Sequence, residues 1–322
     1  MHRSSLTAFV SVVAAGVLGG CGGSTGSLPA AGGNASVGLP ATLQQAGTAK
    51  GLIYSSSYGA NTVDYYLKGT GPNNPIAGAL KGDFAAPQGI AVDKPGNVYV
   101  TNSNGQSVFV YAKGSKSPTL TLVDNNYFPV DVTVAPDGTV YVANGGGDIG
   151  ASGDVLVYRS GASNPMETLT NGHFLHVEGV ALDKNGNVFV SCNAGMGAGT
   201  GGVVEFPKGS STGKDLHITL GAAGGVGFDG DGRLLVMDES VPSLNVYAPG
   251  KRKPLHQLSL PGASRYFAFS KTSRVLYVAD YDLGEIEVYD YAPNALTKTN
   301  TITNGILPSN DNLGIAVYPS QQ

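Results

Sequence analysis

The chain lacks tryptophan and is poor in charged residues and cysteine, and these absences narrow its class. Lys, Arg, Asp and Glu make up 13% of its 322 residues and leave a net charge of −4. No segment concentrates Lys and Arg, which argues against nucleic acid as a partner, because that binding needs clustered positive charge. The two cysteines are Cys21, which lies close to the N-terminus, and Cys192. We expect no intramolecular disulfide, so packing must stabilise the fold.

Long hydrophobic runs are also scarce, and the one that is present lies at the N-terminus. It covers about residues 8–18 after a short basic start, and it is shorter than the roughly 20 apolar residues that span a bilayer. These are the proportions of a secretory signal. The run ends in Leu-Gly-Gly-Cys21, which resembles the lipobox of bacterial lipoproteins. The resemblance implies that residues 1–20 are a lipoprotein signal peptide and that Cys21 is the lipidation site.

The next segment, residues 21–50, is rich in Gly, Ser, Ala and Thr and almost uncharged. Such a composition buries too little apolar surface to order itself and is typical of a flexible tether. The residue after the cysteine is Gly22 rather than the Asp that often retains lipoproteins at the inner membrane. By this resemblance we expect an exported protein, held by its N-terminal lipid at the outer membrane or cell surface.

The strongest signal in the remaining chain is an internal repeat. The segment Gly-Ile-Ala-Val-Asp at residue 89 is followed by Lys-Pro-Gly-Asn and then Val-Tyr-Val, and related copies follow. The copies begin at residues 89, 131, 179, 225, 266 and 314, which gives spacings of 41 to 48 residues. A fixed period of this length is typical of a repeat architecture.

Each unit predicts four short strands. Two apolar strands flank a tight turn rich in Asp, Asn and Gly, a third strand carries a Val-x-Val-Tyr pattern, and a more polar segment completes the unit. The first two strands are continuous apolar runs, which indicates a sheet covered on both faces. Four strands per 40 to 50 residues is the size of a propeller blade. We therefore predict an all-β fold, a six-bladed β-propeller over residues 51–319.

The two ends of this domain each supply part of one blade. Residues 52–54 and 63–66 match a second and a third strand, but no first strand precedes them. Residues 314–318 match a first strand, and no second strand follows. We predict that the C-terminal strand pairs with the N-terminal hairpin and closes the ring, which leaves no sheet edge open.

The segment from Gly89 to Asn102 resembles the NHL and YVTN repeats of β-propellers, and weaker likeness extends through about residues 51–319. Such motifs are strand and turn residues, so they specify a fold better than a function. Members of these families serve as binding scaffolds, sensor ectodomains and surface proteins, and related propellers are lactonases or lyases. The absence of Trp excludes the WD repeat and the Asp-box of sialidases.

Candidate site residues lie where the first strands begin, at the mouth of the expected channel. Glu178 and Arg265 are two blades apart and can form an ion pair across that mouth. A gluconolactonase-like propeller would hold a divalent cation such as Ca²⁺ here, and cations of this kind need several oxygen ligands. Paired side chains, a ligand site and a metal site remain alternatives, and we assign no catalytic residue or metal ligand. The predicted binding residues are Gln88, Asp131, Glu178, Arg265 and Asn312, with Asp311 nearby.

Two other groups of residues have simpler structural interpretations. A polar ring closes the second strands, and its members are expected to satisfy turn backbone; Cys192 among them is expected to be a packed thiol. His173 and His176 could act as general bases in a lyase-like propeller, but no nearby carboxylate is evident in the sequence. The ring consists of Ser56, Asn102, Asn144, Cys192, Asp238 and Asp280.

We expect a binding or scaffold module at the cell envelope rather than an enzyme, without a cofactor. Its partner would be an envelope protein, a glycan or a small molecule, the membrane would be reached through the lipid, and the chain would be a monomer. The alternative is a metal-dependent lactonase or hydrolase, or a lyase, with its site at the channel mouth and a cation such as Ca²⁺.

Overall fold

The computed structural model of the chain describes residues 51–69, 73–124, 127–146, 152–194, 200–308 and 311–320. The expected signal peptide, the lipidation site Cys21 and the tether lie outside these residues. No helix in the described part of the chain is long and apolar enough to cross a membrane.

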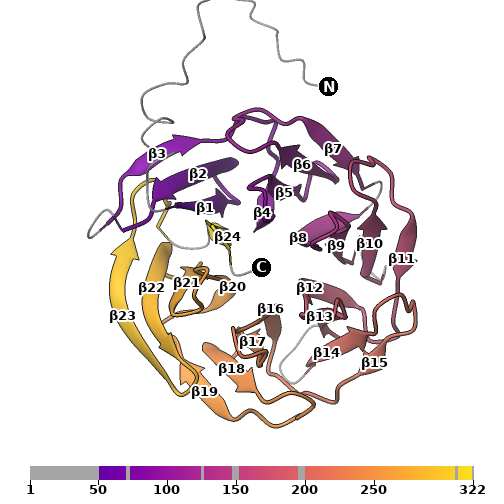
Figure 1. The fold of residues 1–322 in the computed structure, drawn as a ribbon. Helices are drawn as coiled ribbons and strands as arrows, with labels where there is room; N and C mark the ends of the chain where they lie inside the picture. Colours follow the sequence, from indigo (N-terminus) through magenta and orange to yellow (C-terminus); the bar gives the residue numbers. More distant parts are fainter. Residues whose placement is uncertain are drawn as a thin grey trace, which may run out of the picture. The chain divides into compact units, whose positions relative to one another are not determined.

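Six four-stranded antiparallel sheets are arranged as blades around a central axis (Figure 1). The inner strands β24, β4, β8, β12, β16 and β20 lie nearest the axis, and the outer strands β3, β7, β11, β15, β19 and β23 form the perimeter. This confirms the predicted all-β six-bladed propeller. By blade, the strands are β24 (Asn312–Tyr318), β1 (Leu52–Ser57), β2 (Thr62–Leu67) and β3 (Ile76–Ala79); β4 (Pro87–Val92), β5 (Val98–Asn102), β6 (Ser107–Tyr111) and β7 (Leu120–Val123); β8 (Phe128–Val134), β9 (Val140–Gly145), β10 (Asp154–Tyr158) and β11 (Glu167–Leu169); β12 (His176–Leu182), β13 (Val188–Asn193), β14 (Gly201–Phe206) and β15 (Lys214–Asp215); β16 (Ala223–Phe228), β17 (Leu234–Asp238), β18 (Ser243–Tyr247) and β19 (His256–Ser259); β20 (Ser264–Phe269), β21 (Val275–Asp280), β22 (Glu285–Ala292) and β23 (Ala295–Ile302).

The first blade is assembled from both ends of the domain, as predicted. The C-terminal strand β24 is its inner strand and pairs antiparallel with β1, so that Leu52 lies opposite Tyr318 and Tyr54 opposite Ala316. This pairing joins the last strand of the chain to the first and closes the ring without a free inner edge.

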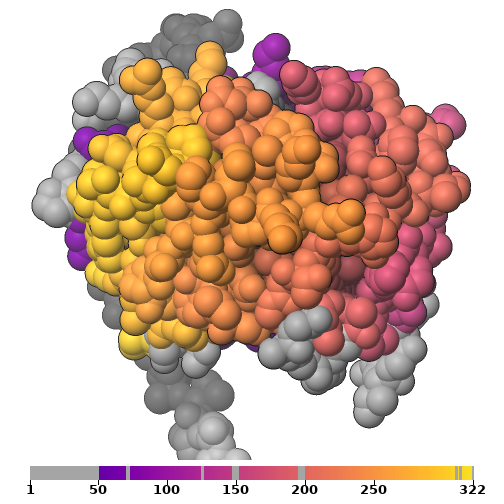
Figure 2. All heavy atoms as spheres, turned by 90° about the horizontal axis from the view of Figure 1, so that it is seen from below, coloured from indigo at the N-terminus to yellow at the C-terminus, as the bar shows by residue number. Residues whose placement is uncertain are grey.

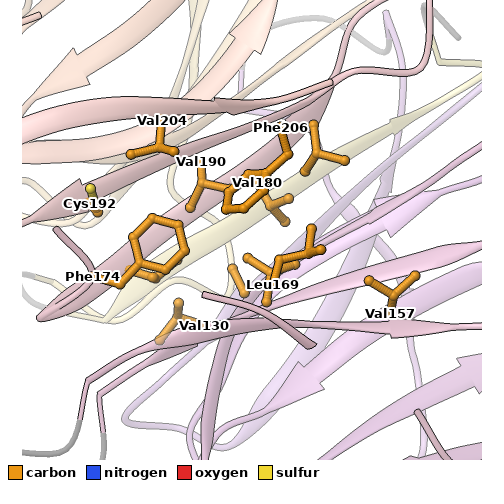
Figure 3. Close-up of a cluster of buried hydrophobic side chains, with 13 residues drawn as sticks. Val130, Val157, Leu169, Phe174, Val180, Val190, Cys192, Val204 and Phe206 are labelled. Atoms are coloured by element: carbon orange, nitrogen blue, oxygen red, sulfur yellow. The ribbon is translucent and has the colours of Figure 1, made fainter. Parts of the chain in front are cut away.

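The blades pack against one another through apolar side chains. All residues of β4 and β5 are buried, as expected for strands covered on both faces. Between the third and fourth blades, Phe174 and Phe206 pack with valines and with Cys192 (Figure 3). Seen from the side, the atoms of neighbouring blades form a continuous outer wall (Figure 2). Burial of this apolar surface is the main source of stability, at roughly 25 cal/mol per Å².

The turns that join inner to second strands are closed by aspartates. Asp93 accepts hydrogen bonds from the backbone of Gly96 and Asn97, and Asp183 does the same for Asn185 and Asn187. Gly96 and its equivalents adopt a positive φ that the turn requires and that suits glycine. The resemblance of these segments to calcium loops is therefore explained by hairpin turns.

Antiparallel pairing places two sets of turns at one end of the blades, which we call the hairpin face. Inner turns join the first strand of a blade to the second, and outer turns join the third strand to the fourth. The inner and outer turns touch, because Lys113 N donates to Asn97 Oδ1 and Lys208 N donates to Asn187 Oδ1. The opposite end, with the remaining connections, is called the loop face. The inner turns of the hairpin face are 93–97, 135–139, 183–187, 229–233 and 270–274, and the outer turns are 68–69 with 73–75, 112–119, 159–166, 207–213, 248–255 and 293–294.

Candidate functional site

Every inner strand contains an irregularity of register near its start, on the loop face. The pairing shifts between Pro87 and Ile90, between Val177 and Gly179, and between Ser264 and Tyr266, and the other three blades show the same shift. Such bulges re-aim side chains. The shifts fall on the residues that the sequence placed at the channel mouth, including Gln88, Glu178 and Arg265.

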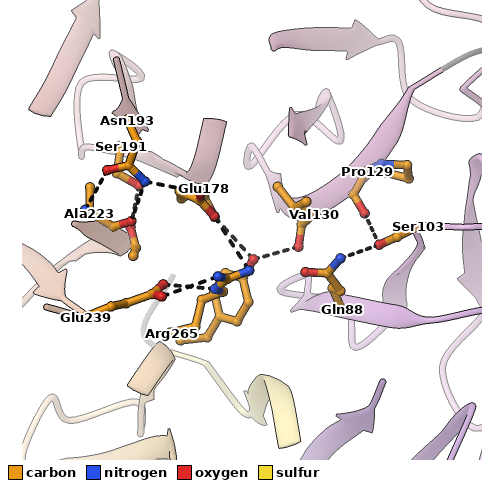
Figure 4. A network of polar contacts seen from close by, with 12 residues as sticks. Gln88, Ser103, Pro129, Val130, Glu178, Ser191, Asn193, Ala223, Glu239 and Arg265 are labelled. Carbon is orange, nitrogen blue, oxygen red and sulfur yellow. Dashed lines mark hydrogen bonds and ion pairs between the residues drawn. The ribbon is translucent and has the colours of Figure 1, made fainter. Parts of the chain in front are cut away.

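Arg265 is the centre of an ionic network at this mouth (Figure 4). Its Nη1 lies 3.7 Å from Glu178 Oε2, which confirms the expected pair across the channel. Its Nε lies 2.9 Å from Glu239 Oε1, and Nη2 lies 3.3 Å from Glu239 Oε2. Burial raises the pKa of Glu178 and of Glu239, and the guanidinium opposes this rise. Glu239 directly follows β17 and the ring residue Asp238, and its position in the sequence does not indicate that its side chain reaches the channel mouth.

Tyr266 closes the channel just below this network. Its hydroxyl oxygen lies 2.9 Å from the carbonyl oxygen of Val130 and 3.2 Å from that of Glu178. Tyr266 belongs to the sixth blade and Val130 to the third, on the opposite side of the ring. The aromatic ring of Tyr266 therefore crosses the central axis, and its hydroxyl links the sixth blade to the third and the fourth.

Gln88 belongs to a second polar chain, which links neighbouring blades. Its Nε2 donates to Ser103 Oγ at 2.8 Å, and Ser103 Oγ donates to the carbonyl of Pro129 at 2.6 Å (Figure 4). Ser56 and Ser191 likewise donate to the carbonyls of Gln88 and Gly224 on the next blade. Oε1 of Gln88 is buried and has no hydrogen-bond partner in the described part of the chain. These hydroxyls fasten the second strand of one blade to the inner strand of the next.

The other predicted mouth residues lie apart from this network. Asn312 is in β24 opposite Ser57, and its side chain lies outside what the structure describes. Asp311 is buried and caps the loop after β1, where it accepts bonds from Ser57 Oγ and from the amides of Gly59 and Ala60. The geometry thus joins Glu178 and Arg265 and leaves Asp311 as a loop cap.

Asp131 faces the opposite end of the channel from the predicted mouth. It lines a cavity of about 1420 Å³ that opens on the hairpin face and also contains Tyr266. Its carboxylate accepts bonds from the amides of Val132 (2.9 Å) and Val180 (3.0 Å). Burial raises the pKa of Asp131 to about 7, against the effect of these two bonds. A buried carboxyl whose pKa is raised to about 7 therefore lies in the wall of this cavity.

A second buried acidic group lies between the second and third blades, and sequence reasoning did not find it. Asn144 Nδ2 donates to Asp154 Oδ1 (2.8 Å) and to Asp124 Oδ1 (3.3 Å). Asp124 is fully buried, its Oδ2 has no hydrogen-bond partner among the described residues, and burial together with Asp154 raises its pKa to about 7. Asp124 directly follows an outer strand, where the fifth blade has the buried Leu260. Asp124 and Leu260 are recognised as equivalent positions only when the blades are superposed.

The remaining polar ring has the structural role that was expected. Asn102 accepts a bond from the amide of Ala85, and Asp238 accepts bonds from the amides of Gly221 and Ala222. Cys192 is buried, and its surroundings raise the pKa of the thiol to about 12. It is a packed thiol rather than a nucleophile.

One of the two histidines considered in the sequence, His173, has a carboxylate within reach, which is not evident from the sequence. His173 Nε2 lies 3.7 Å from Asp215 Oδ2, and His217 Nδ1 lies 2.9 Å from the same atom. Asp215 is in β15, more than 40 residues from His173, so only the fold brings them together. Both imidazoles are exposed, and within the described ranges no three His, Cys, Asp or Glu side chains converge as a metal site.

Comparison with known proteins agrees with this architecture. Residues 84–111, which contain β4, β5 and β6, match the family model of the NHL repeat. A chain from the crystal structure of a nidogen/laminin complex has a TM-score of 0.63 at 15% identity and covers 84% of this chain and 99% of that chain. A protein of unknown function from Bacteroides caccae gives 0.61 at 13% identity, covering 83% and 98%. Kuenenia stuttgartiensis hydrazine synthase gives 0.55 at 16% identity, covering 73% of each chain. At these identities the likeness concerns the fold alone.

Proposed function

We propose that this six-bladed β-propeller, which carries an NHL repeat, is an exported, lipid-anchored binding module that presents its loop face to an envelope protein. The anchor would be Cys21, at the end of the lipobox-like segment. The propeller supplies a rigid platform, and binding requires no cofactor.

One observation carries the choice of face and partner. The loops between second and third strands expose Tyr58, Val241 and Leu283, whose exposed fractions are 39%, 55% and 47%. They occupy the same loop of the first, fifth and sixth blades, which are neighbours in the ring. Single exposed apolar residues are ordinary, but their recurrence on adjacent blades favours a protein contact surface.

The side chains beneath these loops are paired with one another, which favours binding through a rigid surface rather than through a conformational change. Arg265, Glu178 and Glu239 are engaged with one another, and Tyr266 closes the channel below them. A surface supported in this way changes little on binding, which lowers the entropy lost on association. The nidogen/laminin structure is a complex between proteins, which accords with a protein partner here.

The test is capture of a partner from solubilised envelopes by the purified chain, with chemical cross-linking. The double variant Val241→Glu/Leu283→Glu should lose the captured protein, because two charges would be buried in the contact. The matched control is Lys184→Gln/Lys271→Gln, which also lowers the net charge by two but alters the hairpin face. Equal capture by the loop-face variant and the unchanged chain would contradict the proposed surface. Anchoring is tested separately, by mass spectrometry of the N-terminal peptide and its loss in Cys21→Ser.

A second candidate, a hydrolase or lyase, rests on Asp131. A buried carboxyl with a pKa of about 7 in a cavity wall has the properties of a general base. Hydrolysis of a set of lactones, followed by acid release, should then be lost in Asp131→Asn. Stoichiometric Ca²⁺ in the purified protein that disappears in Glu178→Gln would instead support a separate, metal-dependent site at the loop-face mouth.

A further inference from the structure

The basic residues of the propeller gather on the hairpin face, although Lys251-Arg252-Lys253 is the only run of consecutive Lys and Arg residues in the sequence. The turns of this face carry thirteen Lys and Arg against five Asp. They come from all six blades, so that residues more than 200 positions apart, such as Lys68 and Arg274, share one face. One basic residue from each blade in turn is Lys68, Lys113, Arg159, Lys208, Arg252 and Lys271.

These positive charges are available to a partner. Arg233 pairs with Asp229 and Asp231, but no other Lys or Arg of these turns forms an ion pair with a described residue. The acidic residues of the face are used within it, because Asp93 and Asp183 accept bonds from the backbone of their own turns. Lys94, Lys184 and most of the others are exposed.

The opposite face has the opposite charge. Its described connections contain Asp83, Asp124, Glu239, Asp282 and Asp311, and Lys81 is their single basic residue. The small net charge of the chain therefore conceals two oppositely charged faces. The cavity of about 1420 Å³ opens at the centre of this basic face. Its lining contains Lys184 and Lys271 but also Asp131, Asp183 and Asp229, so the excess of positive charge lies on the surrounding turns.

The chain enters the propeller on this same face. Gly51 precedes β1, and its carbonyl accepts a bond from the amide of Lys68 in an outer turn of the hairpin face. The tether proposed for residues 21–50 would join the propeller at this face. A lipid at Cys21 would therefore hold the basic face nearest the bilayer.

We propose that the hairpin face docks on an anionic lipid surface, so that the loop face points away from the membrane. Each Lys or Arg near an anionic membrane contributes about 1 kcal/mol, and several together give useful affinity. The lipid anchor of the proposed function is the reason for choosing a bilayer rather than another polyanion as the partner. The test below omits that anchor, so that docking on lipid and anchoring through Cys21 can fail separately.

The experiment is co-sedimentation of the unlipidated chain, residues 22–322, with vesicles; the ring closes within residues 51–320 and is retained. Vesicles of phosphatidylcholine with phosphatidylglycerol should bind the protein, and vesicles of phosphatidylcholine alone should not. Binding should weaken as salt is raised, because screening shortens the reach of the charges. Lys184→Gln/Lys271→Gln should weaken binding roughly tenfold or more.

The matched control is Val241→Glu/Leu283→Glu, which changes the net charge equally on the other face and should bind vesicles like the unchanged chain. Absence of binding to phosphatidylglycerol vesicles, or an equal loss in both double variants, would overturn the proposal. Tight binding to an RNA homopolymer or to heparin without binding to the vesicles would overturn it as well, and would identify a soluble polyanion as the partner. Circular dichroism melting curves establish that both variants are folded.

Discussion

The two faces of the ring use charged residues in different ways. On the loop face, Arg265, Glu178 and Glu239 are partly buried and paired, and the Tyr266 hydroxyl meets carbonyls of two other blades. On the hairpin face, Lys94 and Lys184 are exposed, and Asp93 and Asp183 accept hydrogen bonds from the backbone of their own turns. The loop face therefore contributes to closure of the ring, whereas the basic residues of the hairpin face remain available for binding.

Because of this difference, substitutions on the two faces should change different properties of the protein. Substitutions of charged residues on the loop face should change stability, since they leave a buried charge or acceptor without its partner. Substitutions of exposed lysines on the hairpin face should change binding and leave stability nearly unchanged.

Replacement of Arg265 by Leu should have the largest effect. It leaves Glu178 and Glu239 close together without a positive charge, and breaking one side of such a pair is strongly destabilising. Because the Arg265 side chain is 26% exposed, we expect a loss of about 2 to 3 kcal/mol rather than the full range for buried pairs. Urea denaturation measures it. Arg274→Leu, on the hairpin face, is the control, and an equal loss in both variants would refute the distinction between the faces.

The next effect concerns Asp124 and depends on pH. Its raised pKa of about 7 means that, between about pH 4 and 7, the folded state holds a proton that the unfolded state has released. This carboxyl therefore makes folding less favourable as the pH rises through that range. Asp124→Asn removes the dependence and keeps an acceptor for Asn144, so it should be about 2 kcal/mol more stable than the unchanged chain at about pH 8 and similar to it at about pH 4. Denaturation at both pH values measures the difference, and a variant less stable at the higher pH would contradict this assignment.

These residues show how much of the fold and of the candidate site could be predicted from the sequence. The repeat predicted six blades and the pairing of β24 with β1, because turn and strand residues recur in each unit. It also placed Glu178 and Arg265 at one mouth, because equivalent positions in a ring face one axis. It could not reveal the partnership with Glu239, or that Tyr266 crosses to Val130, because those contacts depend on the diameter of the ring and on bulges that re-aim side chains.

The charge of the hairpin face was missed for a related reason. A search for basic segments examines neighbours in sequence, but Lys94 and Lys271 reach one face only through the circular arrangement of the blades. The same circular arrangement places Asp131 in the wall of the cavity on that face, instead of at the loop-face mouth where the sequence had assigned it.

A smaller effect is expected from Tyr266→Phe, which removes only the hydroxyl. The carbonyls of Val130 and Glu178 would lose a donor in the closed channel, and a bond of this kind contributes about 1 kcal/mol. Thermal unfolding measures the loss, with Tyr58→Phe in an exposed loop as the control. Unchanged stability would show that water replaces the hydroxyl and that the ring is closed by strand pairing and packing alone.

The smallest effect is expected from Lys184→Gln/Lys271→Gln, in the stability measurement rather than in binding. Both side chains are exposed and form no ion pair with a described residue, so their loss removes no favourable contact. It also reduces repulsion among thirteen basic residues on one face, so stability should stay within about 0.5 kcal/mol of the unchanged chain or rise slightly. The same protein samples, used in urea denaturation and in vesicle binding, allow the two readouts to be compared directly. A clear loss of stability would mean that these lysines hold the ring together, and the functional contrast between its faces would then be wrong.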